Sequence, residues 1–173
     1  MRLALALAAA TTVLTTTGAA AAAPSVEFRD AIVRVTVIPE DRSDVKVEML
    51  TTNNALPIEV RTEGSQTVIS GNLAHRIHDC HTRGDHPTAW VSGIGTVEYK
   101  DMPQIVVRTP KAVAIEAGGA VYGAIGRSAS LDLDNSGCSA WTIADVAGDA
   151  TLRESGAGSV RIPANFTGMV GLK

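Results

Sequence analysis

The sequence has no apolar run long enough to form a membrane-spanning helix. Its longest apolar stretch, residues 3–10, is far shorter than the roughly 20 residues that cross a bilayer, and threonines interrupt the segment directly after it. It also has no G-x-S-x-G motif, no P-loop and no complete G-x-G-x-x-G motif. We therefore expect no transmembrane segment and no bound cofactor, and no familiar enzyme class is indicated.

Excess charge of either sign is absent as well. The chain contains 15 Lys and Arg against 18 Asp and Glu, which gives a formal net charge of −3. A mildly acidic protein attracts neither nucleic acid nor an anionic membrane surface. We expect neither as a partner.

The N-terminus has the features of an export signal. Arg2 supplies a positive charge, residues 3–10 form the apolar segment, and residues 19–23 offer small side chains for cleavage. Pro24 disfavours a cut directly before it, so we predict a signal peptide over residues 1–22 and a mature chain of residues 23–173. The protein is then expected in the periplasm or outside the cell.

Cysteine is limited to Cys80 and Cys138, and they are not arranged as the C-x-x-C pair of thiol oxidoreductases. Two cysteines in an exported chain meet oxidising conditions. We predict that they form one intramolecular disulfide with a structural role. Two buried free thiols and a bond between molecules are the alternatives.

Alternating apolar and polar residues run through most of the mature chain, whereas no helical stripe is evident. Turn-forming residues separate these runs. The pattern predicts an all-β protein. The runs that alternate most clearly are residues 26–28, 31–37, 45–49, 58–60, 97–99 and 105–107.

The last third of the sequence repeats itself every 18 to 20 residues. Each repeat has an alternating apolar pair, a small or glycine turn, further apolar residues and a closing glycine. Such a period is typical of stacked rungs that bury their apolar faces against one another. We predict a single-stranded β-helix, or β-solenoid, with residues 23–74 as a longer-stranded cap or first coils, 75–104 as an irregular connection and 105–173 as regular rungs.

The same alignment predicts which side chains point inward. Apolar residues at equivalent positions should stack through the core, and the incomplete last rung should leave strand edges open to end-to-end self-association. The predicted inward residues are Val113, Ile115, Leu131, Leu133, Ile143, Val146, Leu152, Ile162 and Phe166.

Charged residues alternate with these apolar ones and should form an exposed column. The repeat offsets place Glu116 and Arg153 on either side of Asp134, with Asp132 on the same face of its strand. A solvated face is the simplest interpretation, because exposed ion pairs contribute little. The alternative is a carboxylate pair for glycoside hydrolysis, which needs a cleft as well as suitable spacing.

Two further groups of residues attract attention. Tyr122 and Trp141 occupy matching places in successive repeats, and packing in the core or at a corner is favoured over a ladder that stacks sugars. His75, His78, His81 and His86 cluster around Cys80 in the one segment without a strand pattern. Their spacing permits a zinc or copper site, but a plain polar loop is favoured.

Four segments resemble one family of exported bacterial proteins. They are residues 100–110 (KDMPQIVVRTP), 118–123 (GGAVYG), 135–141 (NSGCSAW) and 155–160 (SGAGSV). Together they are similar to the auto-transporter adhesin head GIN domain family. The resemblance covers about residues 26–172 and implies a strand-only solenoid. It brings no catalytic residues, and no autotransporter barrel follows in this sequence.

The leading hypothesis is an exported, non-catalytic β-solenoid with a binding or adhesin-like role toward an envelope or extracellular ligand, either glycan or protein. The first alternative is a carbohydrate-active enzyme that uses Glu116, Asp134 and Arg153. The second is an envelope metal-binding protein that uses the histidines of residues 75–86.

Overall fold

The fold is described from a computed structural model for residues 22–82, 87–164, 166 and 168–172. The predicted signal peptide, except Ala22, lies outside these residues. The described chain is all-β, as the sequence predicts, with one short 3-10 turn, η1 (Tyr99–Asp101). The strands are β1 (Ser25–Glu40), β2 (Lys46–Thr51), β3 (Glu59–Glu63), β4 (Gln66–Ser70), β5 (Ile77–His81), β6 (Thr88–Val91), β7 (Gly95–Glu98), β8 (Gln104–Pro110), β9 (Ala112–Ile125), β10 (Ser130–Asn135), β11 (Ala140–Ile143), β12 (Asp149–Glu154), β13 (Ser159–Arg161) and β14 (Met169–Leu172).

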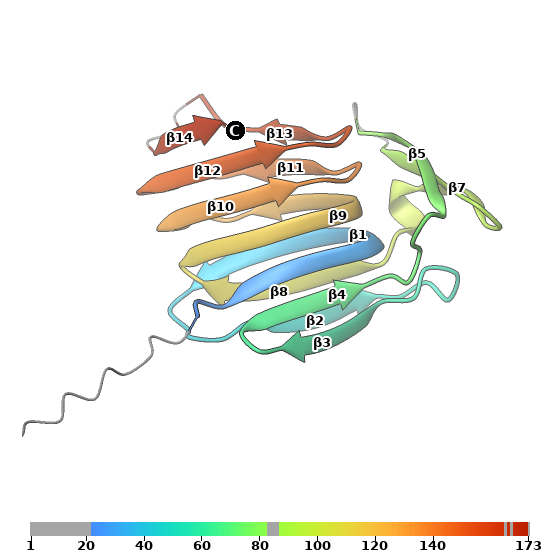
Figure 1. Ribbon diagram of the computed structural model, residues 1–173, viewed down its shortest axis with the longest axis horizontal. Coiled ribbons are helices and arrows are strands. Elements are labelled where there is room, and N and C mark those ends of the chain that lie inside the picture. The colour runs from blue at the N-terminus through green and yellow to red at the C-terminus, as the bar shows by residue number, and fades with distance from the viewer. Residues whose placement is uncertain (1–21, 83–86, 165, 167, 173) are drawn as a thin grey trace, which may run out of the picture.

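Two long strands, β1 and β9, lie side by side at the centre of the molecule (Figure 1). They pair in parallel, with a register irregularity between Phe28 and Ala31. On one side, the first half of β9 pairs with β10 and its second half with β11. On the other side, the first half of β1 pairs with β4 and its second half with β8. Each long strand therefore contributes to two faces.

The strands after β9 pair in parallel, at the spacing that the sequence repeat predicts. Leu133 lies in register with Ile115 on one side and with Leu152 on the other. These offsets are 18 and 19 residues, and Ala150 pairs with Val170 at an offset of 20. The spacing read from the sequence is the spacing between paired strands.

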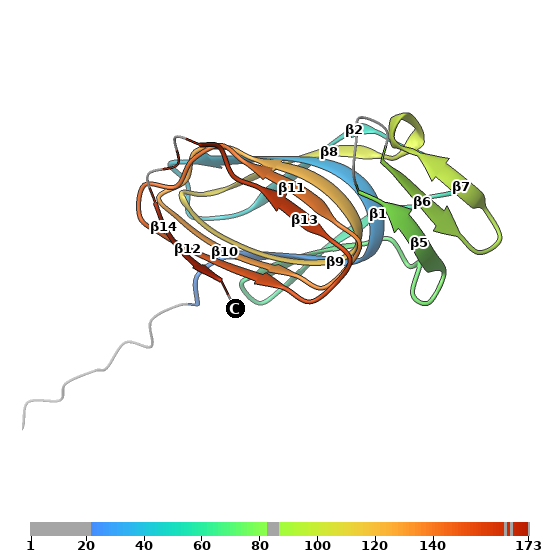
Figure 2. The same cartoon turned by 90° about the horizontal axis from the view of Figure 1, so that it is seen from above.

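The main apolar core lies between the two faces, with β10, β12 and β14 on one side and β11 and β13 on the other (Figure 2). Because neighbouring side chains in a strand point to opposite faces, alternate residues enter this core. Of the nine predicted inward residues, Ile162 and Phe166 are only partly buried and pack against the core. The other seven, Val113, Ile115, Leu131, Leu133, Ile143, Val146 and Leu152, are buried.

Glycines line one corner where the chain passes from one face to the other. A Cβ atom at Gly137 would meet the backbone of Gly119, and one at Gly156 would meet the backbone of Gly137. Gly119 also has a φ of +99°, which disfavours other residues. The glycines of the repeat therefore allow successive rungs to approach closely at this corner.

At the other end of the large sheet the strands are not all parallel. Strand β2 pairs antiparallel with β8, and β3 pairs antiparallel with β4, so the large sheet is mixed. The N-terminal segment is not simply an end cap, since β1 lies between β9 and the β4 and β8 strands.

The predicted irregular connection also contains regular structure. Within residues 71–103, which we call the insertion, β5, β6 and β7 form a separate antiparallel sheet of three strands. The sequence pattern did not predict β5 or β6. These strands are short, and their pairing includes an irregularity between Ile77 and Asp79, which obscures the alternation.

The last strands form an edge of the sheet. In the described residues β13 pairs only with β11, and β14 pairs only with β12. Met169 is 75% exposed at this edge. End-to-end association through these strands stays a prediction. Among the residues described, no helix combines the length and apolar character required to span a membrane.

Candidate functional site

The insertion lies against the outer surface of the face that contains β11 and the second halves of β1 and β9 (Figure 2). Ile32 of β1 and Ala120 of β9 point away from the main core, yet both are completely buried. They pack in a second apolar cluster with Val91 and Val97 of the insertion. The insertion therefore obtains much of its core by covering this outer surface.

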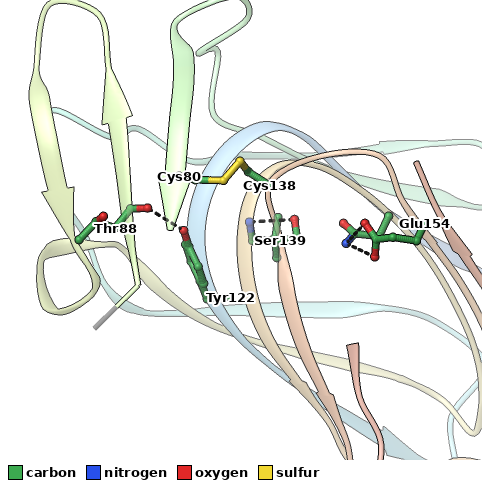
Figure 3. Close-up of a disulfide and its surroundings, with 8 residues drawn as sticks. Cys80, Thr88, Tyr122, Cys138, Ser139 and Glu154 are labelled. Atoms are coloured by element: carbon green, nitrogen blue, oxygen red, sulfur yellow. Dashed lines mark hydrogen bonds between the residues drawn. A yellow bond between two sulfur atoms is a disulfide. The ribbon is translucent and has the colours of Figure 1, made fainter. Parts of the chain in front are cut away.

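A disulfide fastens the insertion at this place. Cys80 of β5 is bonded to Cys138 in the turn between β10 and β11, with a Cα–Cα distance of 6.0 Å (Figure 3). This is the bond that the sequence predicts. The turn is itself held, because the Cys138 N–H donates to the Gly119 carbonyl oxygen over 2.7 Å.

Tyr122 of β9 provides a second attachment. Its hydroxyl donates to the carbonyl oxygen of Thr88 in β6 over 3.1 Å (Figure 3). Burial raises the pKa of the Tyr122 hydroxyl to about 12, because the phenolate would lose hydration. Tyr122 is therefore a neutral hydrogen-bond donor at physiological pH.

An open groove runs beside the insertion, with a volume of about 360 Å³. Its floor is the outer face of the large sheet just beyond the covered part. Tyr99 and Pro87 line the side formed by the insertion. The floor is mostly small and polar, and its exposed residues are Thr36, Ala124, Thr142, Ser159 and Arg161.

Parallel register arranges the floor in two columns. Arg34, Tyr122 and Ala140 are neighbours across β1, β9 and β11, and Ser159 continues this column on β13. The second column contains Thr36, Ala124, Thr142 and Arg161 on the same four strands. Such columns form a rigid, flat surface, because every strand between β1 and β11 is paired on both sides.

Arg34 is the cation at the insertion side of the groove. Its Nε–H donates to the Met102 carbonyl oxygen over 3.2 Å, and its guanidinium lies 5.1 Å from the centre of the Tyr99 ring. The Tyr99 ring in turn makes an edge contact with Tyr122 at 6.0 Å. These contacts hold the guanidinium in place.

The described lining of this groove contains two arginines and no carboxylate. Acid–base hydrolysis of a glycoside usually requires a pair of carboxyl groups. The described groove residues offer guanidinium groups, hydroxyls and aromatic rings.

The predicted charged column lies on the other face of the molecule. Asp134 is in register with Glu116 on one side and with Arg153 on the other, as the repeat offsets predict. The guanidinium of Arg153, however, pairs with Asp132 on the next column. A shallow depression involves Glu116 and Asp134 together with Glu27, and Glu27 pairs with Arg29. Catalysis by Glu116, Asp134 and Arg153 stays a hypothesis.

The histidines are spread over the insertion. His75 lies before β5 with a φ of +58°, and His78 of β5 contacts the Trp90 ring at 5.3 Å and Ser92 Oγ at 2.8 Å. His81 ends β5, and His86 lies outside the described residues. Within residues 22–82 and 87–172, apart from the undescribed 165 and 167, no three metal-ligand side chains come together.

The two aromatic residues of the repeat are both buried, as expected, but they do not occupy matching places. Tyr122 is in register with Ala140, and Trp141 with Gly123. The two rings consequently point to opposite faces, Trp141 into the main core and Tyr122 into the second cluster. Gly123 leaves the space that the Trp141 ring fills. The prediction matched the repeats by residue type, so it missed that Tyr122 and Trp141 are one position out of register.

The sequence pattern did not predict the groove. Its floor residues are small, and they alternate with buried residues like any outward-facing positions. The signal that could have located it is the pair of apolar residues at outward positions, Ile32 and Ala120, because such residues require a covering element.

No family model matches the sequence, so membership of the GIN domain family stays a prediction. No curated protein matches it. One solved structure, described as a "putative cell adhesion protein" from Clostridium sporogenes, is similar with 12% identity over 88% of this chain and 93% of that chain. Its TM-score is 0.30, and at this level the similarity supports no conclusion about fold or function.

Proposed function

We propose that this protein is an exported, non-catalytic binding protein with an adhesin-like role, built on a short β-solenoid. In this proposal residues 105–173 are the rungs of the solenoid and supply a rigid surface. The insertion supplies the wall of the binding groove. The disulfide supports export, since such bonds persist mainly in oxidising compartments.

One observation carries the binding role. The groove combines a flat floor of hydroxyl and small side chains with a wall that a disulfide and a hydrogen bond hold in place. A surface that is ordered before binding loses little conformational entropy when a ligand arrives. The lack of a carboxylate among the described groove residues favours binding over hydrolysis.

Two tryptophan variants on one strand test the role of the groove. Ala124→Trp places a large ring on the groove floor. Ala114→Trp is the matched control, because Ala114 points outward on the other half of β9, beside Asp132. Both proteins should first be checked for native circular dichroism spectra and melting temperatures.

The purified mature chain is then screened on arrays of glycans and envelope proteins, beside a hydrolysis assay with the same glycans. We expect the screen to find a ligand that binds wild type. Ala124→Trp should bind this ligand more weakly, and Ala114→Trp should bind it as wild type does. The proposal would be contradicted if the screen finds no ligand, if both variants lose binding affinity equally, or if the protein hydrolyses a glycan.

A further inference from the structure

The arginines of the described chain fall into two groups. Most contact a carboxylate: Arg29 pairs with Glu27, Arg42 with Glu40 and Arg108 with Glu48, at distances of 2.7–3.2 Å. Four others, Arg34, Arg61, Arg76 and Arg161, have no carboxylate partner among the described residues, and of these Arg34 and Arg161 line the groove. In the described structure, neither Arg34 nor Arg161 forms an ion pair.

Arg34 is the more informative of the two, because it is partly buried and held in place. Only its Nε–H has a hydrogen-bond partner among the described residues, the Met102 carbonyl oxygen. Neither Nη group has a hydrogen-bond partner among the described residues, and the guanidinium lies against the Tyr99 ring, where Arg34 lines both the groove and a neighbouring depression beside Asp101. A partly buried cation with no counter-ion among the described residues favours an anionic ligand, and the planar guanidinium matches a carboxylate with two parallel hydrogen bonds.

We propose that the groove binds a linear glycan that carries carboxylate groups, with Arg34 and Arg161 as its two anion contacts. This rests on the proposed binding function of the groove. The backbones of β1 and β13 lie three strand spacings apart, or about 14 Å. A ligand that reaches both arginines is therefore extended and crosses the strands. The acidic face around Glu116 would repel the same ligand.

The groove floor favours a glycan over an acidic peptide. A peptide that binds a sheet by strand addition needs a free strand edge, whereas β1, β9 and β11 are each paired on both sides; among the described floor strands only β13, at the far end of the groove, has an unpaired edge. The floor instead presents the side chains of Thr36, Thr142 and Ser159. Hydroxyls in fixed rows can exchange hydrogen bonds with successive sugar hydroxyls.

The test uses the mature chain, with its disulfide intact, and isothermal titration calorimetry. The probes are a short oligogalacturonate, its neutral methyl ester, a sulfated dextran and an acidic polyglutamate peptide. Arg34→Gln and Arg161→Gln remove the two groove cations. Arg61→Gln is the matched control, because Arg61 lies on the exposed strand β3, away from the groove, and forms no ion pair with a described residue.

Oligogalacturonate should bind wild type, and methyl esterification or Arg34→Gln should each weaken binding by about tenfold or more. Arg161→Gln should weaken it by less, since its side chain is more exposed, and Arg61→Gln should stay within about twofold of wild type. Added salt should lower the affinity.

Several results would overturn this proposal. Equal binding of acid and ester, equal effects of Arg34→Gln and Arg61→Gln, or a preference for polyglutamate or sulfated dextran would each do so. If a neutral glycan binds wild type and Ala124→Trp abolishes that binding, the groove still functions and only the anionic ligand class is wrong. If no probe binds wild type and the array screen is also empty, both proposals fail.

Discussion

The stacked strands from β9 to β13 and the insertion reach stability by different routes. The stack buries one side of every strand against the same core, and its neighbours repeat at a fixed offset of 18 or 19 residues. The insertion is a small three-stranded sheet whose core is shared with the outer surface of the stack. The repeating stack thus offers a uniform outer surface, and the non-repeating insertion makes the area beside it different from the rest of that surface.

A buried charge in the stack should have the largest effect. Leu133 is 0% exposed at the centre of the core. Leu133→Asp should cost several kcal/mol and unfold the rungs, because its carboxylate would be buried without a partner. Circular dichroism and thermal melting measure the loss. Ser130→Asp adds the same group to the outward side of β10 and should melt near wild type. A native melt for Leu133→Asp would show that the inward register is wrong.

Loss of the disulfide should separate the two regions most clearly. The bond closes a segment of 58 residues, for which the chain-entropy estimate is about 4 kcal/mol. In a Cys80→Ser/Cys138→Ser variant, hydrogen exchange should rise more in β5–β7 than in β10 and β12, because the stack keeps its own core. Mass spectrometry of exchanged peptides measures this. Uniform loss of protection in both regions would mean that they fold as one unit.

The difference between the regions also explains what the sequence could predict. The spacing of glycines and apolar pairs predicted the parallel partners of Leu133 and the burial of most of the core. This was possible because each repeat needs apolar residues at the same inward positions and small residues at the same turn. The disulfide followed from the cysteine count and the expected export. The strands around Cys80 were missed, because their fold depends on contacts with Ile32 and Tyr122, which are distant in sequence.

A methyl group at the glycine corner should have an intermediate effect on the stack. The Cβ of Gly137→Ala would meet the backbone of Gly119, so we expect a cost of about 1–3 kcal/mol. Gly171→Ala is the control, because its added Cβ would meet no heavy atom within 4 Å beyond those of Gly171 and its chain neighbours. Denaturant titration compares the two variants. Equal stability would show that the rungs can separate at this corner without cost.

The smallest effect concerns the hydrogen bond between the regions. Tyr122→Phe removes the bond to Thr88 and should cost about 1 kcal/mol. The pH dependence gives a second measurement. The pKa of Tyr122 is about 12 in the folded protein against 10.0 for a free tyrosine, so unfolding releases a proton between these values and stability falls as pH rises from about 10 to 12. The variant should show a flatter fall over that range. An unchanged slope would mean that Tyr122 is well hydrated.

In the proposed function the two outward faces of β9 differ, and the face beside the insertion binds the ligand. Chemical-shift mapping by nuclear magnetic resonance, with labelled wild-type protein and oligogalacturonate, tests it most directly. We expect chemical-shift changes concentrated at Arg34, Thr142 and Arg161, with the signals of Glu116 and Asp134 unchanged. Shifts concentrated at Glu116 and Asp134 would contradict it.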